Sequence, residues 1–227
     1  MLKAERMVTL RSKVIQWIEA EKVIAIVRGV ELEQCEAVAE ALYIGGIRLL
    51  EITYDQKEPG SWQGTADTIG RLAKKYDGKM FIGAGTVTSP ELVEMTAKAG
   101  GTFIVSPDTD ITVINKTREL GLVSMPGAMT PSEIKTAHNA GADFLKIFPA
   151  GNLGAAYLKA IRAPLSHIKM VATGGINEDN AAEFLKAGAI GLGVGGNLAK
   201  RTWIEAGEYE KLTDAARTLV EIVRNVQ

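Results

Sequence analysis

Short apolar runs recur along the chain, and each one follows a glycine that ends a helix-like segment. The clearest copies span Gly45–Glu51, Gly100–Ser106, Gly141–Lys146 and Gly188–Val194. Glycine is favoured where a helix ends in the left-handed conformation, and a strand can begin soon after it. Each interval between copies has room for two strand–helix units of average size. The hydrophobic pattern therefore predicts further strands between these four.

Four more apolar runs complete the pattern, one before the first copy and one in each of the three intervals. The eight strands are expected to begin near residues 23, 47, 80, 102, 122, 143, 168 and 189. Helical patterns alternate with them, at 32–44, 63–76, 90–99, 110–120, 131–140, 153–162, 178–187 and 208–224. Eight strands that alternate with helices predict an α/β fold, the (β/α)8 TIM barrel.

The segment Val8–Ala20 precedes the first strand and is predicted to be an extra N-terminal helix. No linker or low-complexity stretch divides the chain, so residues 1–227 are predicted to form a single barrel domain. The alternative architecture is a doubly wound open sheet. A G-x-G-x-x-G motif after the first strand would support that sheet, and its absence favours the barrel.

Composition narrows the range of partners. The chain carries 26 Lys+Arg and 27 Asp+Glu, a net charge of −1, so neither nucleic acid nor an anionic membrane is an expected partner. No uninterrupted apolar stretch reaches membrane-spanning length, and the N-terminus lacks the apolar core of a signal peptide. Cys35 is the only cysteine, and no C-x-x-C or H-x-H spacing indicates a metal site. We expect a cytoplasmic protein that needs no metal.

In a barrel of this kind, chemistry takes place where the strands end and the following loops begin. Polar residues and glycines gather at these ends, whereas earlier strand positions are mostly Val, Ile and Leu. The strand-end residues are Arg28, Glu51, Thr53, Gly83–Thr86, Ser106, Pro107, Pro126, Gly127, Lys146, Phe148, Thr173–Gly175 and Gly195–Asn197.

Lys146 lies in Ala142–Pro149, a run that has the pattern of a strand buried on both faces. Burial disfavours the charged ammonium, so such a lysine must find a partner, lower its pKa or act as a neutral amine. A neutral amine in a dry pocket is the nucleophile that forms imines with carbonyl substrates. The alternative is a lysine that extends to the surface from a strand end.

Glu51 lies in the apolar strand segment 48–53, near its end, and Arg28 ends the first strand. A buried carboxylate often has a raised pKa and can transfer protons, or it can simply form an ion pair with Arg28 or Lys146. The guanidinium of Arg28 suits a substrate carboxylate or phosphate, or the same ion pair. A lysine and a glutamate at strand ends are the pair that imine chemistry requires.

Glycine-rich loops follow the last two strands, at Thr173–Asn177 and Gly193–Asn197. Glycine lets backbone N–H groups approach an anion, and the loops after strands seven and eight of a barrel often bind phosphate. Simple turn formation is the alternative. The long polar loop 54–64 either covers the site or is only an exposed loop.

Almost the whole chain resembles the class I aldolases of 2-keto-3-deoxy-6-phosphogluconate (KDPG) and 4-hydroxy-2-oxoglutarate (KHG), including the branch that acts on the galactonate epimer of KDPG. The segments that carry this resemblance are 24–29, 50–53, 82–87, 145–149, 172–176 and 193–196. The resemblance implies a homotrimeric, cofactor-free lyase that cleaves a phosphorylated keto acid to pyruvate and glyceraldehyde 3-phosphate. It assigns the Schiff base to Lys146 and proton transfer to Glu51.

The remaining site residues follow from the strand ends and the resemblance together. Thr86 would hold the pyruvate carboxylate. Substrate contacts are expected from Arg28, Thr53, Thr86, Pro107, Phe148 and Thr173, and phosphate contacts from Gly174, Gly175, Gly195, Gly196 and Asn197. The rival functions are a phosphosugar isomerase or synthase on the same barrel and a non-catalytic phosphosugar-binding protein.

The chain departs from the family pattern in two places. Asp55 stands where many gluconate-type members carry an arginine, so Arg28 would supply the cation, as in the galactonate-type branch. Asn197 stands where the family has a serine in the last phosphate loop. Thr173 is the gluconate-like choice, because galactonate-type members tend to carry valine there. These features point in opposite directions, so the stereochemistry of the sugar acid stays open.

Overall fold

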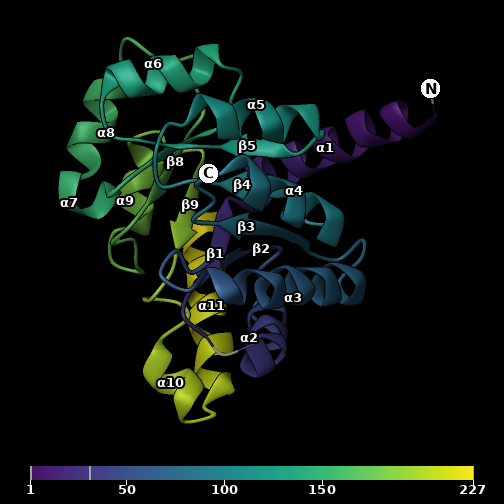
Figure 1. The fold of residues 1–227 in the computed structure, drawn as a ribbon. Coiled ribbons are helices and arrows are strands. Elements are labelled where there is room, and N and C mark those ends of the chain that lie inside the picture. The colour runs from purple at the N-terminus through teal and green to yellow at the C-terminus, as the bar shows by residue number, and fades with distance from the viewer. Residues whose placement is uncertain (1, 31, 227) are drawn as a thin grey trace.

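The computed structural model describes residues 2–30 and 32–226. Its strands form one parallel sheet (Figure 1). The strands are β1 (Val23–Val27), β2 (Leu49–Thr53), β3 (Phe81–Gly85), β4 (Phe103–Val105), β5 (Val123–Met125), β6 (Gly127–Ala128), β7 (Leu145–Ile147), β8 (Met170–Thr173) and β9 (Gly191–Val194).

The two edge strands of the sheet, β5 and β6, are consecutive parts of one segment, 123–128, that is interrupted at Pro126. Strand β5 pairs with β4, and β6 pairs with β7. Proline has no N–H to donate, but the Pro126 carbonyl accepts a hydrogen bond from the Lys146 N–H at 2.9 Å. The segment therefore acts as a single fifth strand that closes the sheet, and the predicted (β/α)8 barrel is confirmed.

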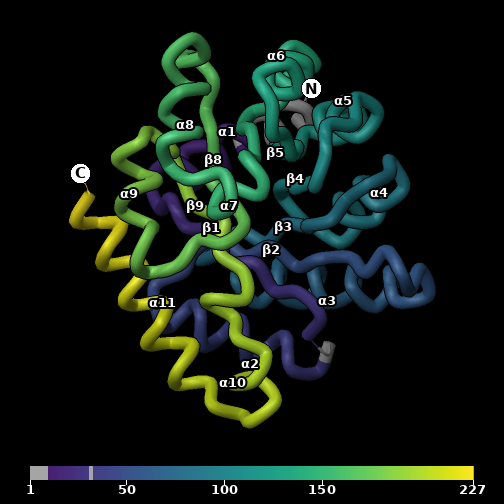
Figure 2. Tube along the Cα trace, turned by 90° about the vertical axis from the view of Figure 1, so that its left-hand side faces the viewer, coloured from purple at the N-terminus to yellow at the C-terminus, as the bar shows by residue number. Residues whose placement is uncertain are grey.

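Helices surround the strands as an outer ring, which Figure 2 shows in a view turned from that of Figure 1. Among the helices that the structure describes, none has the length and apolar composition of a membrane-spanning helix. The helices are α1 (Leu2–Glu21), α2 (Leu32–Ile44), η1 (Pro59–Ser61), α3 (Trp62–Lys75), α4 (Pro90–Ala99), α5 (Ile111–Glu119), α6 (Pro131–Asn139), α7 (Ala150–Leu153), α8 (Ala155–Arg162), α9 (Ala181–Lys186), α10 (Arg201–Glu205) and α11 (Tyr209–Arg224).

Local sequence explains where the helices begin and end. Ser89 and Thr130 cap α4 and α6, each with a proline in the first turn where no N–H is needed. Gly100 ends α4 in the left-handed conformation, at φ 93°. These signals explain why the predicted bounds of α4 agree with the structure.

Three helices differ most from the prediction. The N-terminal helix was expected at 8–20 but spans Leu2–Glu21. The helix expected at 153–162 is α8, which begins at Ala155, and the short helix α7 before it was not predicted; Gly154 at φ 82° interrupts the helical backbone between them. Helix α10 was not predicted, because its five residues are too few to produce a periodic apolar face.

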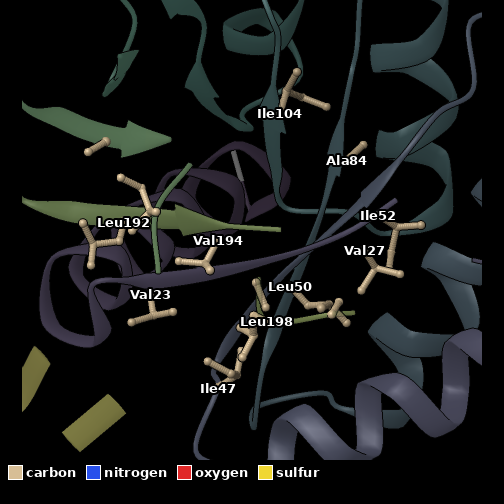
Figure 3. Close-up of a cluster of buried hydrophobic side chains, with 14 of the residues drawn as sticks. Val23, Val27, Ile47, Leu50, Ile52, Ala84, Ile104, Leu192, Val194 and Leu198 are labelled. Atoms are coloured by element: carbon tan, nitrogen blue, oxygen red, sulfur yellow. The ribbon is translucent and has the colours of Figure 1, made fainter. Parts of the chain in front are cut away.

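Successive side chains of each strand point to opposite faces of the sheet, so they contribute to two different apolar cores. Strand side chains that face outward pack against the helices, and Figure 3 shows part of this larger cluster with residues of β1, β2, β3, β4 and β9. Inward-facing side chains such as Leu49, Phe103 and Val171 fill the barrel. Val14 and Ile18 of α1 join this inner cluster and close one end of it. Glu51, Lys146 and Thr173 share the inward alternation with these residues, so the fold directs them into the barrel axis.

Candidate active site

Lys146 points into the barrel from the middle of β7 and is only 3% exposed. Burial lowers the pKa of Lys146, while the charge of Glu51 raises it and the charge of Arg28 lowers it. The Lys146 ammonium nitrogen lies 4.9 Å from the centre of the Phe148 ring. No ion pair within the described residues includes Lys146. The lysine therefore stays buried, contrary to the interpretation in which it extends to the surface.

Glu51 points inward from β2 and is 2% exposed. Burial raises the pKa of Glu51, and the nearby charges of Lys146 and Arg28 act against that shift. Its Oε1 atom is buried and has no hydrogen-bond partner in the part of the chain that the structure describes. A buried carboxyl oxygen without a partner is costly, so it points to a group that receives a proton or a ligand. Within the described part of the chain, Glu51 forms no ion pair with Arg28 or Lys146, so the alternative role of a simple ion-pair partner is not observed.

Strand glycines provide the space that the inward polar side chains occupy. A Cβ atom on Gly85 of β3 would overlap the Glu51 carboxyl group. A Cβ atom on Gly193 of β9 would lie 2.5 Å from the Thr173 hydroxyl oxygen. The missing side chain at Gly85 thus leaves room for the side chain of Glu51.

Arg28 follows β1 and reaches across to the loop after β3, where its Nη2 donates to the Thr86 hydroxyl at 2.8 Å. Asp55 is exposed, and its carboxylate accepts the backbone N–H of Lys57 at 2.8 Å. The carboxylate of Asp55 thus serves a local turn, and Arg28 is the cation that acts electrostatically on both Lys146 and Glu51. That Arg28 takes the place of the family arginine in substrate binding stays a prediction.

The two glycine-rich loops lie against neighbouring backbone. Gly174 and Gly175 have φ of 89° and 76°, a conformation that favours glycine. The N–H of Gly151, which sequence reasoning missed, donates to the Gly174 carbonyl at 2.7 Å. A Cβ atom on Gly151 would lie 2.8 Å from that same oxygen, so only glycine fits there. Gly151 was hidden in a segment that lacks a recognisable motif.

Asn197 uses its side chain within the protein. Its Nδ2 donates to the Ile176 carbonyl at 2.8 Å and so links the loop after β9 to the loop after β8. A contact between Asn197 and phosphate would therefore come from the backbone N–H. Gly195 and Gly196 precede Asn197 in the same loop, and neither has a left-handed φ.

The other predicted substrate contacts occupy strand ends around the same rim. Thr53 ends β2 and is half-buried, Thr173 ends β8 and is buried, and Phe148 follows β7 with 39% of its surface exposed. Phe148 also lies over Gly174, where a Cβ atom would be 3.0 Å from its ring. Pro107 is exposed, and its carbonyl packs against Gly127. The site thus joins Lys146, through Phe148, to the first glycine-rich loop.

The loop 54–64 is shorter than predicted, since η1 and α3 begin within it. The Trp62 indole donates to the Asp55 carbonyl at 2.8 Å, and the Gln56 amide donates to the Thr86 carbonyl at 2.9 Å. The loop is therefore attached to the strand-end site through Gln56, a residue for which the sequence carried no signal. Across the residues that the structure describes, no group of three or more His, Cys, Asp or Glu could hold a metal ion.

The chain matches a known protein family and several of its members. The family model described as KDPG and KHG aldolase matches residues 14–215. The 2-dehydro-3-deoxy-6-phosphogalactonate aldolase of Escherichia coli (strain K12) is 36% identical over 185 residues, which cover 81% of this chain and 87% of that protein. The KHG/KDPG aldolase of the same strain is 33% identical over 193 residues, covering 84% and 87%.

Solved structures of aldolases have a fold similar to that of this chain. A structure described as native KDPGal has a TM-score of 0.81 at 33% identity, covering 90% of this chain and 95% of that chain. The KDPG aldolase of Legionella pneumophila has a TM-score of 0.79 at 28% identity, covering 89% and 95%. That enzyme holds pyruvate captured at low pH as a covalent carbinolamine intermediate.

Proposed function

Because this chain belongs to the KDPG and KHG aldolase family, a family of carbon–carbon lyases, we propose that it is a class I aldolase whose Schiff base forms on Lys146. Its substrate is a 2-keto-3-deoxy-6-phospho sugar acid, or the shorter 4-hydroxy-2-oxoglutarate. The products are pyruvate and an aldehyde, which is glyceraldehyde 3-phosphate for the phosphorylated acids. The observation that carries the proposal is the pair of buried, inward-facing groups Lys146 and Glu51, which form no ion pair with each other.

Neutral Lys146 attacks the C2 ketone, and burial favours this neutral form because it lowers the pKa of Lys146. The resulting carbinolamine takes up a proton and loses water, which gives a protonated imine that acts as an electron sink; hydrolysis later returns this proton. Glu51 takes the proton of the C4 hydroxyl, directly or through a water molecule, and the C3–C4 bond breaks. Its electron pair passes into the imine to form an enamine, while C4 becomes the aldehyde carbonyl. Proton return to C3 and hydrolysis then release pyruvate and regenerate the amine.

The raised pKa of Glu51 suits both halves of this sequence. A general acid–base group works best when its pKa lies near the working pH, because it must both take and return a proton. The unpartnered Oε1 of Glu51 has no competing hydrogen bond among the described groups, so it is available to substrate or water. Removal from water thus shifts the pKa of both reacting groups, since it disfavours the charged form of each.

Recognition of the substrate divides between two ends of the site. Arg28 and Thr86, joined by a 2.8 Å hydrogen bond, hold the carboxylate next to the ketone. The backbone around Gly174, Gly175, Gly195 and Gly196, with the Asn197 N–H, holds the phosphate. Thr53, Pro107, Phe148 and Thr173 line the space between the two ends. The gluconate and galactonate epimers both carry these charged groups, so turnover of each must be compared directly.

We further propose that the enzyme is a cytoplasmic homotrimer formed by a single domain, residues 1–227. The family resemblance supports the trimer, and the single cysteine agrees with a reducing compartment.

Borohydride trapping tests the proposed mechanism. Incubation with pyruvate and borohydride is expected to add a reduced pyruvyl group to Lys146, which peptide mass spectrometry identifies. Lys146→Ala should lose both the adduct and aldol cleavage while it keeps its folded circular dichroism spectrum. An adduct on a different lysine, or cleavage by the alanine variant, would refute the assignment.

The same experiment separates the rival functions. An isomerase or synthase that uses Lys146 as an acid or base would turn over a phosphosugar without a trapped imine. A non-catalytic sensor would bind the phosphosugar and release no pyruvate. A pyruvate-release assay across both phosphorylated epimers and 4-hydroxy-2-oxoglutarate then identifies the preferred substrate.

A further inference from the structure

Thr86 has an unusual backbone conformation. Its φ is 56°, in the left-handed region, and Lys22 is the only other non-glycine residue described with positive φ. Left-handed backbone is unfavourable for a β-branched side chain, because the branched Cβ crowds the following carbonyl. Such a conformation persists only when surrounding contacts determine it, and it is typical of functional sites. The contacts that hold Thr86 therefore bear on the function of its hydroxyl.

The side chain of Gln56 makes one of these contacts. Its Nε2 donates to the Thr86 carbonyl at 2.9 Å, and its Oε1 accepts the Thr88 hydroxyl at 2.8 Å. Both ends of the amide are therefore used, which fixes the orientation of the side chain. The amide thus joins the loop after β2 to the loop after β3, at the strained residue Thr86 and at Thr88 two positions later.

Other hydrogen bonds hold the backbone before and after Thr86 and the Thr86 hydroxyl itself. The Gly85 carbonyl accepts the Tyr54 N–H at 3.0 Å, so the two strands remain paired up to the turn. The N–H of Val87 donates to the Val105 carbonyl at 3.2 Å, which anchors the chain after the turn. Between these anchors, Thr86 turns its hydroxyl toward Arg28, whose Nη2 donates to it at 2.8 Å. Gln56 is the side chain that holds the carbonyl of the turn.

We propose that Gln56 is a positioning residue that holds Thr86 in its left-handed conformation and so sets the geometry of the Arg28–Thr86 pair for the substrate carboxylate. The inference rests on the proposed aldolase function, because that function assigns the carboxylate to this pair. Gln56 itself touches the protein backbone, and it acts on the substrate through Thr86.

Loss of this amide has a specific consequence. Without a donor on its carbonyl, Thr86 can relax toward ordinary backbone angles, which turns its hydroxyl away from Arg28. Binding of a carboxylate should weaken, whereas reaction of Lys146 with a ketone that has no carboxylate should be unaffected. One intramolecular hydrogen bond typically changes binding by about 3- to 10-fold.

The test compares two ketones in matched variants. In Gln56→Ala, the concentration of pyruvate that gives half-maximal borohydride trapping should rise about 3- to 10-fold, with little change for acetone. The matched control is Gln63→Ala, which removes an exposed glutamine amide that donates to Asp67 at 2.8 Å on α3. That control should match the wild type with both ketones. Equal losses with pyruvate and acetone, or no loss with either, would overturn the proposal.

A double-mutant cycle tests the route through Thr86. Once Thr86→Ala has removed the hydroxyl, Gln56→Ala should weaken pyruvate trapping little further, because the two residues act as a unit. Fully additive losses would show that Gln56 acts elsewhere and would overturn the proposal.

Lactate separates a failure of this inference from a failure of the imine mechanism. Lactate carries the carboxylate but has no ketone, so its binding, followed by NMR titration, does not depend on Lys146 chemistry. If the wild type forms no imine, the aldolase mechanism fails. A weaker lactate complex in Gln56→Ala than in Gln63→Ala still supports the role of Gln56. Equal lactate affinities in these two variants would refute it.

Discussion

The carboxyl group of Glu51 occupies the space that a side chain on Gly85 would require. Glu51 lies on β2 and Gly85 on the adjacent strand β3, and a Cβ atom built on Gly85 would overlap the Glu51 Oε1. Both positions face the barrel axis, so the absence of a side chain at one makes room for the functional group of the other. The position of the proposed proton-transfer group thus depends on the absence of a side chain at Gly85.

Gly85→Ala is expected to displace the Glu51 carboxyl group and lower the rate of carbon–carbon cleavage by about 10²-fold or more, near the range for loss of a general base. Imine trapping on Lys146 should survive better than cleavage, which is read from pyruvate trapping and pyruvate release in the same sample. Combining Gly85→Ala with Glu51→Asp, whose shorter side chain needs less space, should cost little beyond Glu51→Asp alone. Strictly multiplicative losses would contradict the steric explanation.

Glu51→Gln keeps the shape of the side chain but removes the proton-transfer group. Cleavage is expected to fall about 10²- to 10⁴-fold, with a smaller effect on imine formation. Steady-state pyruvate release and single-turnover trapping measure the two steps separately. Near-normal cleavage by the glutamine variant would leave Glu51 with a structural role only.

The same variant tests the raised pKa of Glu51. Between the ordinary pKa of a glutamate and the raised value, the folded state binds more protons than the unfolded chain. The free energy of unfolding of the wild type therefore falls as pH rises through this window, and Glu51→Gln lacks that loss. The difference in melting temperature, variant minus wild type, should increase with pH across the window. A difference that decreases instead would indicate an ion-paired carboxylate with a lowered pKa.

Arg28→Lys should raise the Michaelis constant roughly tenfold, because a charge-assisted hydrogen bond to the substrate is lost or misdirected. A lysine keeps the positive charge but replaces the planar fork of the guanidinium with a point charge, which suits a carboxylate less well. The measurement is kcat and KM for aldol cleavage, with Arg201→Lys on the exposed face of α10 as the matched control. An unchanged Michaelis constant in Arg28→Lys would exclude Arg28 from carboxylate binding.

Gly196→Val tests the phosphate loop without a backbone penalty. No described atom lies within 4 Å of a Cβ built there, and Gly196 lacks the positive φ that makes Gly174 and Gly175 unsuitable for substitution. The valine side chain should block the approach of phosphate to the loop backbone. We expect kcat/KM for a phosphorylated substrate to fall about tenfold or more, since several charge-assisted hydrogen bonds are disturbed. For 4-hydroxy-2-oxoglutarate kcat/KM should change little, and equal losses on both substrates would refute the phosphate assignment.

The sequence by itself determined the order of strands and helices. Apolar runs after helix-ending glycines mark the strands, because each strand is buried on both faces and tolerates few polar residues. The polar exceptions, Lys146 and Glu51, were visible for the same reason. The caps of α4 involve only residues close to the helix in sequence, so they could be predicted without knowledge of any tertiary contact.

Only the tertiary structure decided how side chains from distant strands meet. Glu51 fits beside Gly85, Gly151 approaches Gly174, and Arg28 reaches Thr86 across 58 positions of the chain. Such contacts depend on the register and closure of the barrel, to which every strand contributes, and no periodic pattern encodes them. The role proposed for Gln56 could not be predicted for the same reason. In the sequence Gln56 is one polar residue in a polar loop, and only the closed barrel places it against the strained turn at Thr86.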